Sequence, residues 1–184
     1  MTVHTPVRMT KEAFLAWVDQ REERYEYSGG RVIMMVRVTR NHSRVTSNLI
    51  AALKARLPSE RYDVLAESFA VHVEDSVFFP DVLVEPRQPD GKSLRAESPI
   101  LIVEVLSPGS FHLDFSEKRH AYLTLPTLDT YLIIEPNELR AWVWQRSDGA
   151  FPSDPEIIEG AGEQVALPAL AIDIQFEEIY RGVG

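Results

Sequence analysis

Hydrophobic residues recur at helical spacing in two parts of the first sixty residues. Thr10 can cap a first helix, in which the apolar side chains between Phe14 and Val18 share one face. A second helix is predicted from its expected cap, Asn41, to Leu57, because every fourth residue from Val45 onward is apolar. Between the two helices, Tyr25 to Val36 is typical of a hairpin with a glycine turn.

The rest of the chain shows mainly strand patterns. Ile100 to Ser107 is almost wholly apolar, as expected for a central strand that is buried on both faces. Residues 151–167 are predicted to form a surface loop. The other predicted elements are a helix and several strands: Asp63–Val73 as two short stretches, Asp81–Glu85, the helix Asp114–Leu125, Thr130–Ile134, Leu139–Gln145 and Ala171–Phe176. This order predicts an α/β (α+β) fold with a mixed sheet flanked by helices.

The composition is typical of one soluble globular domain. The chain has 184 residues, of which 45% are hydrophobic and 26% are charged, and it has no cysteine. Disulfides, thiolate zinc sites and cysteine nucleophiles are therefore excluded. The N-terminus lacks the apolar core of a signal peptide, and the longest apolar run, Ile100–Leu106, is too short to cross a bilayer. We expect a single domain over residues 1–184, located in the cytoplasm and without a membrane partner.

Positive charge is concentrated in one segment of an acidic chain. The formal net charge is −9, but the segment from Arg31 to Arg61 holds seven basic residues and only one acid, Glu60. Such a segment could contact a phosphate backbone. It could equally be the solvated surface of a helix and a hairpin, so charge alone does not choose between these interpretations.

Two carboxylates fall within predicted apolar strands. Glu104 interrupts the most apolar strand, where an unpaired ionised carboxylate would cost several kcal/mol. Asp81 begins another such strand and converges on Glu104 if the two strands are neighbours. Two carboxylates with a backbone carbonyl and waters would suit Mg²⁺. The alternative for Glu104 is a structural ion pair or contact with solvent, and the alternative for Asp81 is an ordinary turn.

Three polar residues share one face of the helix predicted after the central strand. Asp114, Lys118 and Tyr122 are spaced four residues apart. Lys118 could therefore bring an ammonium group to the two acids, where it would orient a water or stabilise phosphate charge. The alternatives are an exposed lysine, a capping box over Asp114–Glu117, and a tyrosine ring that only packs.

These motifs resemble a known protein family in order along nearly the whole chain. The matching segments are Tyr25-Glu26 with Gly30, His42, Pro80-Asp81, Val103–Pro108, Asp114 with Lys118 and Tyr122, and Leu167–Leu170. The chain resembles the bacterial restriction-endonuclease-like proteins of the PD-(D/E)XK nuclease superfamily, which are classed as a domain of unknown function. The segment Val103–Pro108 and the helix face that follows it form the most specific part of the match.

The resemblance implies a restriction-endonuclease-like fold and a metal-dependent endonuclease that hydrolyses phosphodiester bonds in DNA. It implies that Mg²⁺, with Mn²⁺ able to substitute, is held by Asp81, Glu104 and the backbone carbonyl of Val105. Asp81 and Glu104 would be catalytic together with Lys118. The superfamily pattern places a lysine two residues after the second acid, where this chain has Leu106, and the family supplies the lysine from the following helix instead.

Further assignments follow from the same resemblance. Glu26 and His42 match family positions and, with Asp114 and Tyr122, are accessory candidates. The basic segment would contact the nucleic-acid backbone rather than the bases, through Arg37, Arg40 and Arg44. A homodimer is expected by analogy, because superfamily nucleases often pair to cut both strands.

Two other functions are compatible with the sequence. An inactivated relative would use the fold to bind nucleic acid or protein without turnover, and the acidic net charge favours this alternative. A glycosidase with paired carboxylates is disfavoured, because Trp142 and Trp144 are the only sign of an aromatic sugar site.

Overall fold

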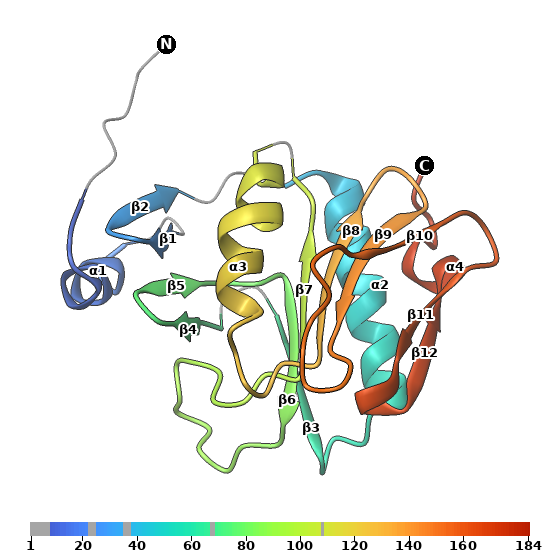
Figure 1. Cartoon of the computed structure of the whole chain (residues 1–184), viewed down its shortest axis with the longest axis horizontal. Helices are drawn as coiled ribbons and strands as arrows, with labels where there is room; N and C mark the ends of the chain where they lie inside the picture. Colours follow the sequence, from blue (N-terminus) through green and yellow to red (C-terminus); the bar gives the residue numbers. More distant parts are fainter. Residues whose placement is uncertain (1–7, 22–24, 35–37, 67–68, 108) are drawn as a thin grey trace.

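The computed structural model describes residues 8–21, 25–34, 38–66, 69–107 and 109–184, and its largest element is a six-stranded sheet (Figure 1). The strand order in this sheet is β10-β9-β8-β7-β6-β3. Only β7 and β8 are parallel, and the other neighbours are antiparallel. The strands are β3 (Tyr62–Ala66), β6 (Val82–Pro86), β7 (Leu101–Val105), β8 (Thr130–Glu135), β9 (Arg140–Gln145) and β10 (Glu156–Glu159). The predicted mixed sheet is therefore confirmed.

A second, four-stranded sheet lies beside the first and is joined by the N-terminal helix α1 (Lys11–Val18). Its strand order is β2-β1-β5-β4. The strands are β1 (Tyr25–Ser28), β2 (Arg31–Met34), β4 (Val71–Val73) and β5 (Ser76–Phe78). Phe14 of α1 stacks on Tyr27 of β1 with 5.2 Å between ring centroids, which fixes the helix on this sheet.

Helices cover both faces of the six-stranded sheet (Figure 1). The long helix α2 (Arg40–Arg56) packs its apolar stripe against one face. On the other face, a π-helical turn, η1 (Leu113–Lys118), continues directly into α3 (Arg119–Tyr122). The C-terminal elements are β11 (Gln164–Leu167), the 3-10 turn η2 (Pro168–Leu170), β12 (Ile172–Gln175) and α4 (Phe176–Ile179).

Strand β7 is buried on both faces and divides the core in two. Its residues Leu101, Val103 and Val105 pack in the cluster that contains the α2 stripe. Ile102 and Leu106 belong to the cluster on the α3 side. Because side chains alternate along a strand, Glu104 also points to the α3 side, and this orientation places the candidate site.

Two details of the predicted helices were wrong. The cap of α2 is Thr39 and not Asn41, because the Thr39 hydroxyl accepts a hydrogen bond from the His42 amide at 3.2 Å. The helix predicted over Asp114–Leu125 begins at Leu113 with π-helical geometry and ends at Tyr122. Asp114 therefore lies inside the turn, where its carboxylate faces Lys118 instead of capping the helix.

The C-terminal prediction was also partly wrong. Residues 151–167 contain the edge strand β10 and the strand β11 rather than only a loop. The exposed faces of these strands carry mainly polar residues, so apolar periodicity is weak there. The last predicted strand ends at Gln175, and Phe176 begins α4. Strand β5 was not predicted. Among the described residues, none of the helices is long and apolar enough to span a membrane.

Candidate active site

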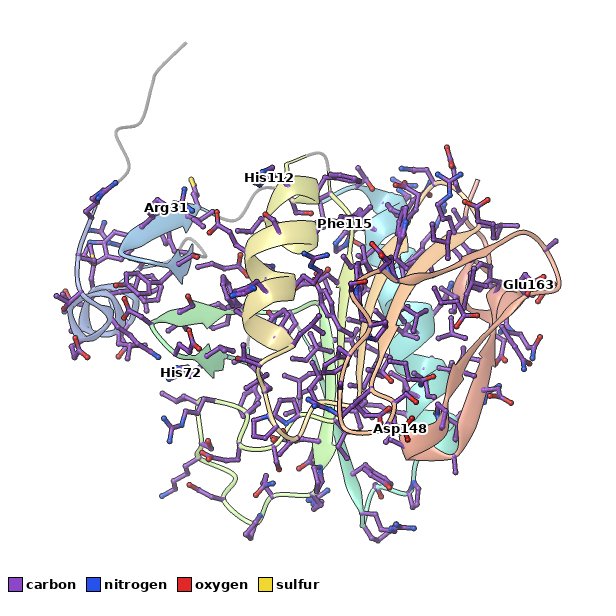
Figure 2. All side chains as sticks on the ribbon, in the orientation of Figure 1. Arg31, His72, His112, Phe115, Asp148 and Glu163 are labelled. Carbon is purple, nitrogen blue, oxygen red and sulfur yellow. The ribbon has the colours of Figure 1, made fainter. Side chains whose placement is uncertain are left out.

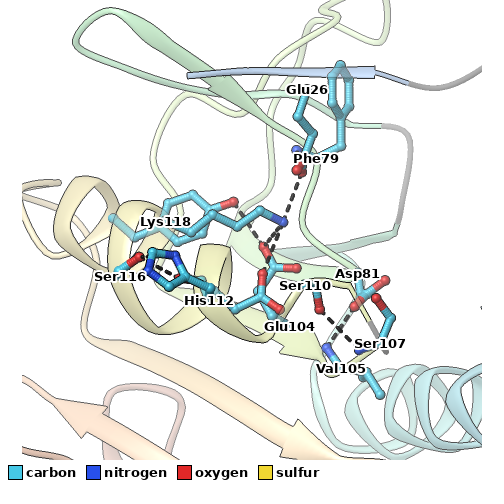
Figure 3. A network of polar contacts seen from close by, with 12 residues as sticks. Glu26, Phe79, Asp81, Glu104, Val105, Ser107, Ser110, His112, Ser116 and Lys118 are labelled. Carbon is cyan, nitrogen blue, oxygen red and sulfur yellow. Dashed lines mark hydrogen bonds and ion pairs between the residues drawn. The ribbon is translucent and has the colours of Figure 1, made fainter. Parts of the chain in front are cut away.

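A pocket of about 100 Å³ lies at the end of β7, where the large sheet faces the small one. Most of the residues that the sequence singled out line it. They are Glu26 from β1, His42 from α2, Asp81 before β6, Glu104 and Val105 from β7, and Lys118 from the π-helical turn. Figure 3 labels all of these except His42. Segments far apart in the sequence thus meet at one place.

The Lys118 ammonium lies at the centre of three carboxylates. Its Nζ is 2.9 Å from Glu26 Oε1, 3.0 Å from Glu104 Oε1 and 3.4 Å from Asp114 Oδ1. Figure 3 shows Lys118 between Glu26 and Glu104. Each of these four residues is at most 3% exposed. Lys118 is therefore a buried ion-pair partner and not the exposed lysine of the alternative interpretation.

Strand pairing brings Asp81 next to Glu104. Strands β6 and β7 are antiparallel with Val82 opposite Val103, and one more step along this register sets Asp81 opposite Glu104. The Val105 amide donates a hydrogen bond to Asp81 Oδ2 at 2.7 Å, which fixes the carboxylate at the end of the strand. Figure 3 shows Asp81, Glu104 and Val105 together.

Two tyrosines support the cluster from the α3 side. The Tyr122 hydroxyl donates a hydrogen bond to Glu104 Oε1 at 3.1 Å. The Tyr131 hydroxyl donates to the Asp114 carbonyl at 3.0 Å and so braces the π-helical turn. A π-helical turn inserts one residue relative to an α-helix and often marks a functional site.

Burial and like charges shift the ionisation of this cluster. Burial raises the pKa of Glu104 well above its ordinary value, and Asp114, Asp81 and Glu26 raise it further, against the opposing effect of Lys118. Burial also raises the pKa of Asp114, to about 6. For Lys118, burial lowers the pKa, but the three carboxylates around it outweigh burial and raise it well above the ordinary value. Lys118 is thus protonated at neutral pH.

The donor set at the pocket fits a divalent cation that keeps several waters. The contacts of Glu104 within the described residues all use Oε1, and those of Asp81 all use Oδ2, so each carboxylate has one oxygen free. The Val105 amide points at Asp81, and a strand residue directs its N–H and C=O to the same side. In the described part of the chain, no three or more His, Cys, Asp or Glu side chains are grouped so that they could hold a metal by themselves. A cation here would therefore need the backbone carbonyl and waters as further ligands. Two carboxylates and a carbonyl suit Mg²⁺, which retains waters.

His42 acts on Asp81 from α2. Its Nε2 lies 3.3 Å from Asp81 Oδ2, and its side chain is 2% exposed. The Thr39 hydroxyl caps the N-terminus of α2, which is the end of the helix that carries His42. His42 therefore lines the pocket and helps to orient the Asp81 carboxylate.

Of the three arginines predicted to contact the nucleic-acid backbone, the structure describes two. Arg37 lies outside the described residues. Arg40 is exposed at the start of α2, and Arg44 is half-buried one turn later. Neither of these two lines the pocket.

The sequence did not indicate several residues that hold the site together. The Phe79 amide donates to Glu26 Oε1 at 3.0 Å. Glu117 accepts a hydrogen bond from the Ser28 hydroxyl at 2.7 Å and pairs with Arg31, which ties the small sheet to the π-helical turn. These contacts join distant segments, so no local sequence pattern could have revealed them.

The mixed sheet, with acids and a lysine gathered at one end, defines a restriction-endonuclease-like protein. A crystal structure described as “a putative nuclease belonging to DUF820”, from Anabaena variabilis, superimposes with a TM-score of 0.77. The match covers 94% of this chain and 97% of that chain at 18% identity, and it shows the shared fold. The chain belongs to the Uma2 family, described as “Putative restriction endonuclease”, which matches residues 11–177.

Two similar proteins come from Synechocystis sp. One, “Uncharacterized protein sll1609”, is 31% identical over 140 residues, which cover 73% of this chain and 79% of the relative. The other, “Uncharacterized protein slr1290”, is 25% identical over 191 residues, which cover 100% of this chain and 99% of the relative. The predicted family is confirmed by the family match and the predicted fold by the structural match, and the description of the family points to a nuclease.

Proposed function

We propose that this protein is an Mg²⁺-dependent endonuclease that hydrolyses phosphodiester bonds in DNA. One observation carries the proposal: Asp81, Glu104 and Lys118 line a single pocket although they are distant in sequence. Costly buried charges that converge in a pocket are typical of catalytic sites. Family membership supports the same reaction class.

Asp81, Glu104 and the Val105 carbonyl would hold the cation. When bound, a divalent cation lowers the pKa of a water and polarises the phosphate. The Val105 amide and His42 keep Asp81 in position. Tyr122 and Lys118 hold Glu104 through Oε1, so that its other oxygen faces the pocket.

Lys118 supplies positive charge rather than a base. Its raised pKa keeps it protonated, so it cannot remove a proton from water near neutral pH. Its ammonium can offset the negative charge that develops on the phosphate during attack. In this reaction a water oxygen bonds to phosphorus as the bond to the 3′ oxygen breaks. The departing oxygen takes up a proton, giving 5′-phosphate and 3′-hydroxyl ends.

Alanine substitutions test this proposal. Asp81→Ala and Glu104→Ala should each reduce Mg²⁺- or Mn²⁺-dependent DNA cleavage by about 100-fold or more, because each removes a cation ligand. Glu97→Ala removes an exposed carboxylate outside the pocket and should leave cleavage unchanged. Calorimetric titration with Mn²⁺ gives a second readout, in which Glu104→Gln should weaken binding. Equal cleavage by wild type and both alanine variants would refute the proposal.

A second candidate function is a non-catalytic nucleic-acid-binding or protein-binding module. It is favoured by the net charge of −9 and by Lys118, which already provides a positive charge inside the acid cluster. This alternative predicts nucleic-acid or protein binding without turnover in any divalent metal.

If duplex DNA is cut on both strands, we expect two copies of the chain to act together, which sedimentation would detect as a homodimer.

A further inference from the structure

A second pocket of about 300 Å³ adjoins the candidate active site. Its wall includes Thr39, Ser107, Phe111, Glu135 and Asn137. Ser107 lines both pockets, and Thr39 caps the helix whose His42 lines the first one. In Figure 3, Ser107 lies beside Asp81 and Val105. Because the two pockets share Ser107, a nucleic-acid strand with a phosphate in the first pocket could place a neighbouring group in the second.

Phe111 presents a rigid aromatic surface at this second pocket. Its side chain is 58% exposed. Its ring stacks on Phe115, which Figure 2 labels, with 4.5 Å between ring centroids and 28° between ring planes. Phe115 in turn packs edge-on against Trp142 at 5.0 Å. The stack holds the Phe111 ring from behind while much of its surface remains open to solvent.

Exposed apolar side chains are concentrated around the two pockets. Six large hydrophobic residues are exposed in the described part of the chain, and three of them, Met34, Val38 and Phe111, line these pockets. A site that contacted only the phosphate backbone would need basic groups rather than an apolar rim. An apolar rim beside a phosphodiester pocket fits the faces of nucleobases.

Polar groups in the second pocket match the edge of a base. The Glu135 carboxylate accepts hydrogen bonds from the amide and side chain of Asn137, each at 3.2 Å. Asn41 at the start of α2 donates to Asn137 Oδ1 at 3.1 Å and fixes that side chain. Carboxylates accept hydrogen bonds from exocyclic amino groups of bases. The pocket thus combines an aromatic face with hydrogen-bonding groups.

We infer that this second pocket holds an unpaired nucleobase, stacked on Phe111, from the strand whose phosphate enters the candidate active site. The inference rests on the proposed function of the first pocket. In a duplex both faces of each base are covered by its neighbours, so a base reaches Phe111 only if it is unstacked. The substrate is therefore single-stranded or locally unpaired DNA. Stacking on aromatic side chains is a general way of binding single strands.

Binding to short oligonucleotides tests this inference without cleavage. The probe is a fluorescein-labelled single-stranded 12-mer, about the length that such sites cover, and its anisotropy is measured in EDTA at low salt. Phe111→Ala should weaken binding by about 5- to 150-fold, whereas Phe111→Trp should keep it. Leu94→Ala, which removes another exposed apolar side chain outside both pockets, should have no effect. A duplex of the same sequence should bind more weakly to the wild type.

Abasic substitutions then identify the stacked base. One abasic position should weaken binding to the wild type by the same factor as Phe111→Ala, and it should cause no further loss in Phe111→Ala. Because Phe111 is exposed, thermal unfolding should show that the variant is folded.

The outcomes separate this inference from the proposed function. Abasic-sensitive binding without metal-dependent cleavage supports the base pocket and refutes the nuclease. Cleavage that Phe111→Ala leaves unchanged, with equal binding of single strands and duplex, refutes the base pocket alone. Absence of oligonucleotide binding in EDTA refutes the base pocket, whereas the nuclease proposal is decided by the cleavage assay with Mg²⁺ or Mn²⁺.

Discussion

At the scale of single residues, the site is dominated by one cation among four acids. Lys118 contacts three carboxylates, and a fourth acid, Asp81, lines the pocket with Glu26 and Glu104. Removing one partner from a buried ion pair is usually costlier than replacing the whole pair with apolar groups. Because there are four acids and only one lysine, the cluster keeps an excess of negative charge that a bound divalent cation can offset.

Asp114→Asn is expected to reduce the loss of stability that accompanies a rise in pH from about 4 to about 6. Burial raises the pKa of Asp114 from 3.8 to about 6, so the folded protein binds this proton more tightly than the unfolded chain does. The stability from the protonated group is fully present below about pH 4 and is lost as the pH rises through about 6, in total about 3 kcal/mol. Urea unfolding across this range measures the slope.

The matched control for this experiment is Asp173→Asn on β12, which changes an exposed carboxylate. It should leave the slope of stability against pH as in the wild type. If Asp114→Asn and Asp173→Asn give the same slope, Asp114 does not carry the shifted ionisation.

The sequence indicated the acids and the lysine but not their partners. Glu104 stood out because a charge in an apolar strand is costly, and that reasoning needs only local sequence. The four-residue spacing of Asp114, Lys118 and Tyr122 indicated a shared helix face, and this inference also needs only local sequence. The contacts of Glu26 with Phe79 and of His42 with Asp81 depend on tertiary packing, so only the family resemblance pointed to these positions.

At the scale of elements, two short features aim the functional groups. The start of α2 places His42 against Asp81, and the π-helical turn η1 directs Asp114 and Lys118 to the sheet. The sequence predicted a helix at both places, from apolar periodicity in the case of α2. It did not predict the π-helical geometry, because the extra residue in the turn is stabilised by tertiary contacts such as the Tyr131 hydrogen bond.

Thr39→Ala should lower the free energy of unfolding by about 1 kcal/mol, because it leaves the His42 amide without its capping partner. Asn41→Ala should cost less than half as much, since Asn41 lies inside the helix and its hydrogen bonds are exposed. Chemical denaturation of both variants gives the comparison. A larger loss for Asn41→Ala would show that the cap is assigned to the wrong residue.

At the scale of the whole molecule, the site forms where two sheets meet. Glu26 comes from the small sheet, and Glu104 comes from the large one. The buried apolar strands at the centre of the large sheet were predictable, whereas the edge strands β10 and β11 were not. Edge strands have solvent on one side, and their residues do not need to be apolar.

The positive charge at the start of α2 should contribute to the salt dependence of DNA binding. If Arg40 and Arg44 each contact a phosphate, the double alanine variant should lower the slope of log affinity against log salt by about 1.4 for single-stranded DNA. Lys54→Ala, near the other end of the same helix, should leave the slope unchanged. An unchanged slope in the double variant would exclude both arginines as backbone contacts.

The distance along the chain between Glu26 and Lys118 has a consequence for protein synthesis. The acid cluster needs the first hairpin and the π-helical turn together, and Glu117 links the same two segments through Ser28 and Arg31. A nascent chain therefore cannot assemble the cluster until residue 118 has left the ribosome. Truncated products that end before this point would lack the site, so incomplete translation would release no hydrolytic fragment into the cell.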